Sequence, residues 1–72
     1  MRNLLVKVGM MPGKIQEVAV QEGANVADAL RVADVEVPSG YTIKVNESTA
    51  DMEAVLQNGD LVLVAKNFKG NQ

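Results

Sequence analysis

Few side chains in this chain of 72 residues could carry out covalent or acid–base chemistry. It has no cysteine and no histidine, which excludes disulfides, thiolate nucleophiles and zinc-finger sites, and removes the commonest general base. Hydrolytic or metal chemistry would need carboxylates that converge in a pocket. The closely spaced acids instead fall in predicted turns and at outward strand positions: Glu17 and Glu22, Asp34 and Glu36, Asp51 and Glu53. We therefore predict no catalytic residue, no metal site, no cofactor and no enzymatic activity.

The segment from Gly9 to Gly13, followed by Lys14, resembles a phosphate-binding loop only in composition. It lacks the Gly-Lys-Ser/Thr ending and the helix that such a loop requires. Pro12 has a fixed φ and Gly13 tolerates a positive φ, which is typical of a tight turn. We therefore predict a hairpin turn here, with Met10 and Met11 at its tip capping one end of the core; the alternative is that they form a soft contact surface.

Charge is unevenly distributed along the chain, whose net charge is −2. Residues 1–14 and 61–72 contain lysine or arginine but no acid, and all nine carboxylates lie between Glu17 and Asp60. The basic ends carry too few cations for a nucleic-acid footprint, so nucleic acid is not a predicted partner. The chain also lacks the long apolar run of a membrane span and the apolar segment of a secretory signal. We expect a cytoplasmic monomer.

The hydrophobic pattern predicts five regular elements. Alternation of apolar and polar residues indicates strands over 3–8, 15–20 and 41–45. Asn25 is a good N-cap, and apolar residues recur after it at spacings of three and four, which predicts a helix over 26–33. Residues 61–65 are apolar on both faces, as in a strand from the interior of a sheet.

The sequence also predicts the connections between these elements. Residues 34–40 contain Pro38 and Gly40, which no helix would continue through, and residues 46–49 are turn-forming. For residues 50–57 we predict an irregular segment that contributes Met52, Val55 and Leu56 to the core. Asn58, Gly59 and Asp60 form the strongest turn signal in the chain, since Asn and Gly both tolerate positive φ.

The order strand, strand, helix, strand, strand predicts an α+β fold in which a mixed sheet wraps one helix. The long connection through the helix allows the first and last strands to lie side by side in parallel at the centre of the sheet. The alternation then assigns one set of residues to the face that packs on the helix: Leu4, Val6, Val18, Val20, Ile43, Val45, Val62 and Val64.

The opposite face of this sheet receives Leu5, Leu61 and Leu63, with Lys7, Lys44 and Lys66 expected at its rim, and nothing in the sequence is left over to cover it. An apolar patch with a charged rim is typical of a protein-binding surface. The alternative is that these leucines lie between central strands and are partly covered by neighbouring side chains.

Several short motifs resemble a known family. They are Val26-Ala27-Asp28-Ala29-Leu30 after Glu22-Gly23, Val45-Asn46, and Leu56-Gln57-Asn58-Gly59-Asp60-Leu61-Val62, followed by a tail that reaches Lys69-Gly70. Together they resemble the prokaryotic ubiquitin-like β-grasp proteins, and within those the sulfur-carrier type, meaning the thiamine sulfur carrier and the small subunit of molybdopterin synthase. The resemblance covers nearly the whole chain. It implies a β-grasp domain over 1–66 and a flexible tail over 67–72.

The resemblance also implies chemistry at the C-terminus. In such carriers the tail ends in Gly-Gly, and the terminal carboxylate is adenylated and then converted to a thiocarboxylate or, in ubiquitin, to an amide with lysine. Glycine gives the extended tail access to the activating enzyme. Here Lys69 stands before Gly70 and the chain continues, so the carrier role would require removal of Asn71 and Gln72. Glu47 replaces the glycine that often follows Asn46 in such proteins, which predicts a looser turn there.

The sequence is compatible with three functions. The first is a non-enzymatic binding module that docks onto a larger protein through the open face and a tail containing Phe68, Lys69 and Gly70. The second is a sulfur carrier or protein modifier, activated at Gly70 by an adenylating enzyme and associated with a protease. The third is a subunit of a regulatory or translation-associated assembly, because fold does not determine function.

Overall fold

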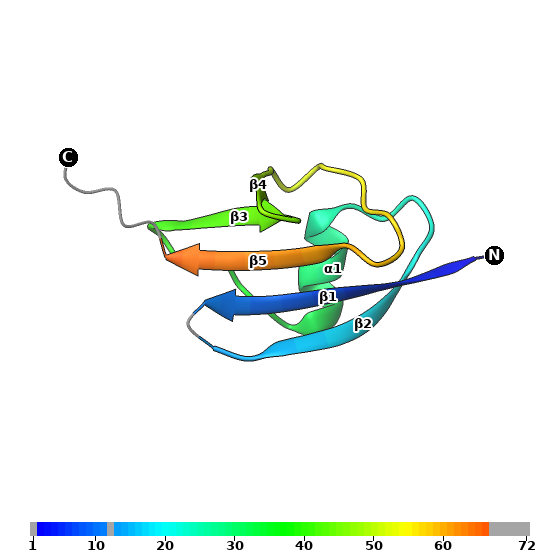
Figure 1. Ribbon diagram of the computed structural model, residues 1–72, viewed down its shortest axis with the longest axis horizontal. Coiled ribbons are helices and arrows are strands. Elements are labelled where there is room, and N and C mark those ends of the chain that lie inside the picture. The colour runs from blue at the N-terminus through cyan, green and yellow to red at the C-terminus, as the bar shows by residue number, and fades with distance from the viewer. Residues whose placement is uncertain (1, 12, 67–72) are drawn as a thin grey trace.

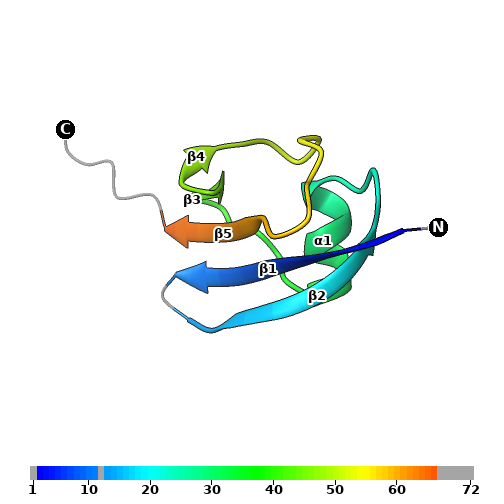
Figure 2. The same cartoon turned by 45° about the vertical axis from the view of Figure 1, so that its right-hand side comes forward.

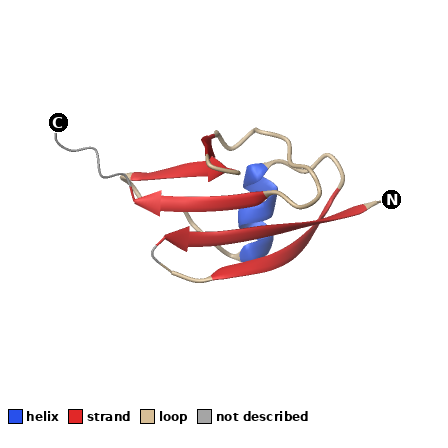
Figure 3. Cartoon of the chain, in the orientation of Figure 1, coloured by secondary structure: helices blue, strands red, loops and turns tan. Residues whose placement is uncertain are grey.

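A five-stranded sheet and one helix make up the protein in a computed structural model that describes residues 2–11 and 13–66. The strand order is β2-β1-β5-β3-β4, with β1 and β5 parallel at the centre and the other pairs antiparallel. Figures 1 and 3 show the two central strands side by side, as the sequence predicts, so the α+β architecture is confirmed. The elements are β1 (Asn3–Met11), β2 (Ile15–Gln21), α1 (Val26–Ala33), β3 (Tyr41–Val45), β4 (Ser48–Thr49) and β5 (Leu61–Lys66).

Helix α1 occupies the predicted residues because both of its ends are capped. The Asn25 side chain accepts a hydrogen bond from the Asp28 backbone N–H at 2.9 Å, and the Asp28 carboxylate accepts one from the Asn25 N–H at 3.1 Å. At the other end Asp34 adopts a left-handed conformation and donates its N–H to the Arg31 carbonyl. Eight residues are too few for a stable helix in water, so packing must hold α1 in place.

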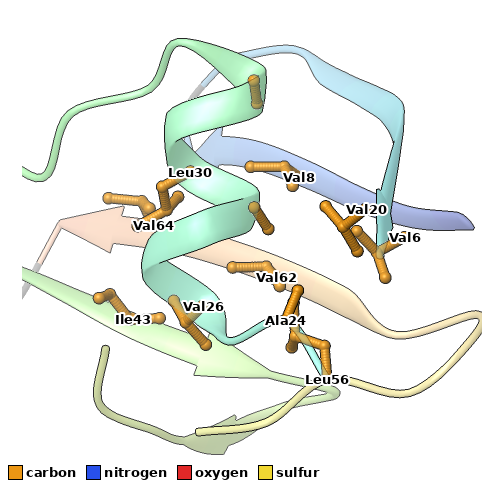
Figure 4. Close-up of a cluster of buried hydrophobic side chains, with 12 residues drawn as sticks. Val6, Val8, Val20, Ala24, Val26, Leu30, Ile43, Leu56, Val62 and Val64 are labelled. Carbon is orange, nitrogen blue, oxygen red and sulfur yellow. The ribbon is translucent and has the colours of Figure 1, made fainter. Parts of the chain in front are cut away.

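One layer of apolar side chains fills the space between α1 and the sheet. Figure 4 shows valines from the central strands pointing toward the helix, with Leu30 and Val26 pointing back at them. The predicted helix-facing side of the sheet is therefore confirmed. The buried set is Val6, Val8, Val20, Ala24, Val26, Ala29, Leu30, Ala33, Ile43, Leu56, Val62 and Val64.

Strand β1 is three residues longer than the sequence predicts. The glycine at position 9 was expected to end it, yet Gly9 pairs with Ile15 of β2 and Leu63 of β5, and pairing with β5 continues to Met11. Two flanking partners compensate for the weak strand propensity of glycine. Met10 then packs on the edge of the core as predicted, whereas Met11 is exposed.

The turn between β3 and β4 differs from the prediction of a looser loop. Val45 pairs with Ser48 across a tight two-residue turn, in which Asn46 (φ 52°) and Glu47 (φ 75°) are both left-handed. The Asn46 side chain holds this conformation, because its amide donates to the Asp60 carboxylate at 2.8 Å and its oxygen accepts from the Leu61 N–H at 3.0 Å. Long-range hydrogen bonds thus compensate for the missing glycine.

The turn at residues 58–60 starts β5, as predicted, but only Gly59 has a positive φ. Asn58 acts through its side chain, which accepts a hydrogen bond from the Leu5 N–H at 2.8 Å. The Gly59 N–H donates to the Leu5 carbonyl and the Lys7 N–H donates to the Asp60 carbonyl. This turn therefore attaches β1 to the beginning of β5.

The irregular segment over 50–57 contributes only part of the core expected from it. Leu56 is buried as predicted, but Met52 and Val55 are exposed, so that expectation was wrong for both. Val55 forms a single β-bridge with Asn25, and alternation across this bridge turns its side chain outward while Leu56 points inward. None of the helices in the described part of the chain is long and apolar enough to cross a membrane.

Candidate functional site

The candidate site is the outer face, which we define as the side of the sheet turned away from α1. Figure 2 shows the helix on one side of the sheet, and none of the described residues forms a second layer on the other side. The strand register brings all five residues predicted for this face together: Leu5 and Lys7 from β1, Leu61 and Leu63 from β5, and Lys44 from β3.

The leucines form a diagonal line across the central strands. Leu63 lies in register between Gly9 of β1 and Lys44 of β3, and Leu61 lies beside Lys7. Both leucines are half-buried by their neighbours, whereas Leu5 is 51% exposed. The face therefore offers one strongly exposed leucine and two partly covered ones, which combines the two alternatives that the sequence left open.

Two further apolar residues lie on the outer face and were missed in the sequence. Ile15 (50% exposed) follows from alternation along the strand predicted over 15–20, because it has the same parity as Glu17, and Met11 (47% exposed) follows once β1 is continued through Gly9. Ile15 lies directly over Gly9, because a Cβ built on that glycine would stand 2.5 Å from Ile15 Cγ1. We call the resulting set the apolar strip: Leu5, Met11, Ile15, Leu61 and Leu63.

A shallow depression of about 610 Å³ opens beside the apolar strip, lined by Lys7, Ile15, Gln16, Glu17 and Leu61. Lys7 and Glu17 face each other across β1 and β2, so their charges largely offset one another locally. Lys44 is exposed beside Leu63 with Thr49 as its cross-strand partner, and it carries the unbalanced positive charge of this face. The expectation that Lys66 lies at this rim was wrong, because Lys66 is in register with the inward-facing Tyr41, and alternation therefore places it toward the other side of β5.

No arrangement for acid–base or metal chemistry accompanies these residues in the described ranges, 2–11 and 13–66. No three acidic side chains there stand close enough to hold a metal ion. The Asn25 N–H, followed by the Arg31 guanidinium, lowers the pKa of Asp28, whose carboxylate caps α1 on the far side of the sheet. What the outer face can do physically is bury apolar surface against another molecule.

The predicted tail residues Phe68, Lys69 and Gly70 lie outside the described residues. The last described residue, Lys66, ends β5 at the same end of the sheet as Met11, because β1 and β5 are parallel.

Comparison with solved structures identifies the architecture. Two crystal structures of small archaeal modifier protein 1 (SAMP1) from Haloferax volcanii match with a TM-score of 0.73 each. One is 16% identical, covering 93% of this chain and 99% of the other, and the second is 15% identical, covering 89% and 98%. The chain has the ubiquitin-like β-grasp fold. A ubiquitin-like protein from Trypanosoma brucei also matches this β-grasp domain, with a TM-score of 0.62, 13% identity and coverage of 90% and 95%.

No family model and no curated protein matches this β-grasp domain by sequence. The resemblance to ubiquitin-like β-grasp proteins inferred from the short motifs is confirmed by the structural neighbours. At these levels of identity the neighbours establish the fold.

Proposed function

We propose that this ubiquitin-like domain is a non-enzymatic protein-binding module that acts in the cytoplasm and docks onto a larger protein through its outer face. The observation that carries the proposal is the apolar strip, in which Leu5, Met11 and Ile15 are each about half exposed. The half-buried Leu61 and Leu63 lie between these exposed residues along β5, so the strip is continuous across the central strands. A continuous apolar surface of this kind is typical of a site that a partner covers.

The chemistry of the face defines the partner. Leu63 and Leu61 form a half-buried centre, while Lys44 supplies a positive charge at the rim that forms no ion pair with another of the residues in 2–11 and 13–66. A complementary surface is apolar at its centre and carries a carboxylate opposite Lys44. Burial of the leucines would supply most of the affinity, and the lysine would supply orientation and the rate of encounter.

The test begins with a photo-crosslinking amino acid at position 63, introduced in the native host, followed by mass spectrometry of the crosslinked protein. The affinity of that purified partner is then measured for the double variant Leu5→Ser/Leu63→Ser. We expect affinity to fall at least about tenfold, because the interface loses one apolar contact at its centre, Leu63, and the strongly exposed Leu5. Lys44→Glu should slow association and remove part of its salt dependence.

Val55→Ser is the matched control, since Val55 is 60% exposed but lies on the 50–57 segment, away from the outer face. It should bind the partner as the unaltered chain does. Unchanged binding of the Leu5→Ser/Leu63→Ser variant, with circular dichroism showing an intact fold, would remove the outer face as the docking site.

A second candidate function is a protein modifier or sulfur carrier activated at Gly70 after trimming of Asn71 and Gln72. It is favoured by the whole-length structural likeness to a protein named a small archaeal modifier, together with the position of Gly70 near the C-terminus. An adenylating enzyme would be its partner, and an associated protease would remove the last two residues.

Intact-mass analysis of the protein purified from its native host tests this second function. A modifier should yield a species that lacks Asn71 and Gln72, either with sulfur in place of one carboxylate oxygen or joined through an amide to lysine of another protein. Gly70→Ala should reduce the amount of such a product, because a side chain hinders the approach of the tail to an activating enzyme. Recovery of full-length chain alone would exclude the modifier role while leaving the docking proposal intact.

A further inference from the structure

Strand β2 (Ile15–Gln21) forms one edge of the sheet, and within the described residues no strand pairs with its outer side. An exposed edge of this kind presents unpaired N–H and C=O groups to any other strand. Edge strands are commonly protected by proline, bulges or several lysines, whereas the seven residues of β2 contain one charged residue, Glu17.

The ladder with β1 shows which backbone groups of β2 point outward. The Glu22 N–H donates to the Arg2 carbonyl, and Lys14 accepts from the Met10 N–H, so the even-numbered residues of this segment bond to β1. Because antiparallel ladders alternate, the odd-numbered residues direct their backbone groups to the open side. These residues are Ile15, Glu17, Ala19 and Gln21.

Helix α1 adds an apolar wall beside this edge. A groove of about 420 Å³ runs between α1 and the end of β2, and Val32 and Ala19 are among the residues that line it. Val32 is 55% exposed, although the helix buries Val26, Ala29, Leu30 and Ala33. Gln16 fixes the helix next to the strand, because its side-chain amide donates to the Ala33 carbonyl at 3.0 Å.

We propose that this protein forms a two-fold dimer in which β2 pairs antiparallel with β2 of a second copy, centred on Val18. In this register Glu17 lies opposite Ala19 of the second copy. Lys14 at one end of the strand lies opposite Glu22 of the second copy at the other, and the symmetry creates this charge pair twice. Lys14 and Glu22 are both exposed in the single chain. They would occupy non-hydrogen-bonded positions, where side chains come closest.

The charges along β2 favour a second copy of this chain as the pairing strand, and they also favour one register of that pairing. Centring the pairing on Glu17 would place Glu17 against itself, and centring it on Ala19 would separate Lys14 from Glu22. Only the Val18-centred pairing joins both opposite charges without a like-charge contact, which favours a second copy over an unrelated strand. The two sheets then continue as one, with both helices on the same side and both Val32 side chains flanking the two-fold axis.

This dimer differs from the monomer expected from the sequence, and it leaves the outer faces uncovered, so it is independent of the docking proposal. Sedimentation equilibrium from micromolar to millimolar concentrations should show the mass rising toward twice that of the chain. Amide hydrogen exchange at Glu17 and Ala19 should slow as the concentration and the dimeric fraction of the protein rise, because the N–H groups of these residues gain hydrogen-bond acceptors. A constant monomer mass over this range would overturn the proposal.

Charge reversal tests the register. Lys14→Glu should weaken dimerisation about tenfold, since two symmetric attractions become repulsions. The double variant Lys14→Glu/Glu22→Lys should restore it. Lys66→Glu is the control, because it makes the same charge change at the exposed end of β5, which β1 separates from β2, and it should have no effect. Equal weakening by Lys14→Glu and Lys66→Glu, or no recovery in the double variant, would contradict the proposed pairing.

Ala19→Pro removes one outward N–H without removing a bond to β1, so it should yield a folded monomer. A dimer that persists in this variant with circular dichroism unchanged would show that β2 is not the interface. If Ala19→Pro unfolds the chain, the charge-reversal pair decides the question alone.

Discussion

Replacement of Leu56 by alanine is expected to lower the free energy of unfolding by about 2–5 kcal/mol. Leu56 is 2% exposed and is among the largest fully buried side chains in the described core. Its backbone is anchored by a hydrogen bond from its N–H to the Ala24 carbonyl at 2.9 Å, so the segment cannot easily move inward to fill the cavity. A domain of this size has little stability in reserve, and the loss would remove a large share of it.

Urea unfolding followed by circular dichroism measures this effect. Leu5→Ala is the matched control, because it deletes the same atoms from a side chain that is 51% exposed. It should shift the midpoint by far less than Leu56→Ala. Similar shifts for the two variants would show that the irregular 50–57 segment does not complete the core as described.

Gly9→Ala is expected to destabilise the protein by about 1–3 kcal/mol through overpacking. The new Cβ would stand 2.5 Å from Ile15 Cγ1 and 2.9 Å from the Lys14 carbonyl oxygen, both far inside van der Waals contact. The φ of Gly9 is not positive, so the expected effect is steric and does not arise from backbone strain. Either Ile15 or the end of the β1–β2 hairpin must shift.

A double-mutant cycle with Ile15→Ala separates these two contacts. Removing Ile15 Cγ1 relieves the closer one, so Gly9→Ala should cost less in the Ile15→Ala background than in the unaltered chain. The rescue should be incomplete, because the Lys14 carbonyl belongs to the backbone and stays in place. Additive changes in the free energy of unfolding would contradict the packing of Ile15 over Gly9. Because Ile15 belongs to the apolar strip, Gly9→Ala should also disturb partner binding.

Patterns local in sequence determined much of this fold. The helix over Val26–Ala33 follows from the capping residue Asn25 and the apolar spacing of the eight residues after it, and β3 follows from strict alternation over five residues. Alternation also assigned Leu5, Leu61 and Leu63 to the face away from the helix, because a side chain's face is set by its position along its own strand. The sequence alone therefore predicted the apolar centre of the proposed docking site.

Other features of the site depend on partners remote in sequence. Gly9 continues β1 because Ile15 and Leu63 flank it, and this pairing adds Met11 to the outer face. The tight turn at Asn46 depends on Asp60 and Leu61.

The sequence by itself determined which residues could be strand or helix and which side each would present, since these follow from steric periodicity and local hydrogen bonding. The tertiary structure alone decided where β1 ends, which apolar residues stay exposed, and that β2 is the open edge. Those properties depend on which residues pair with or pack against a given residue in the folded chain, and these partners can be far from it in the sequence.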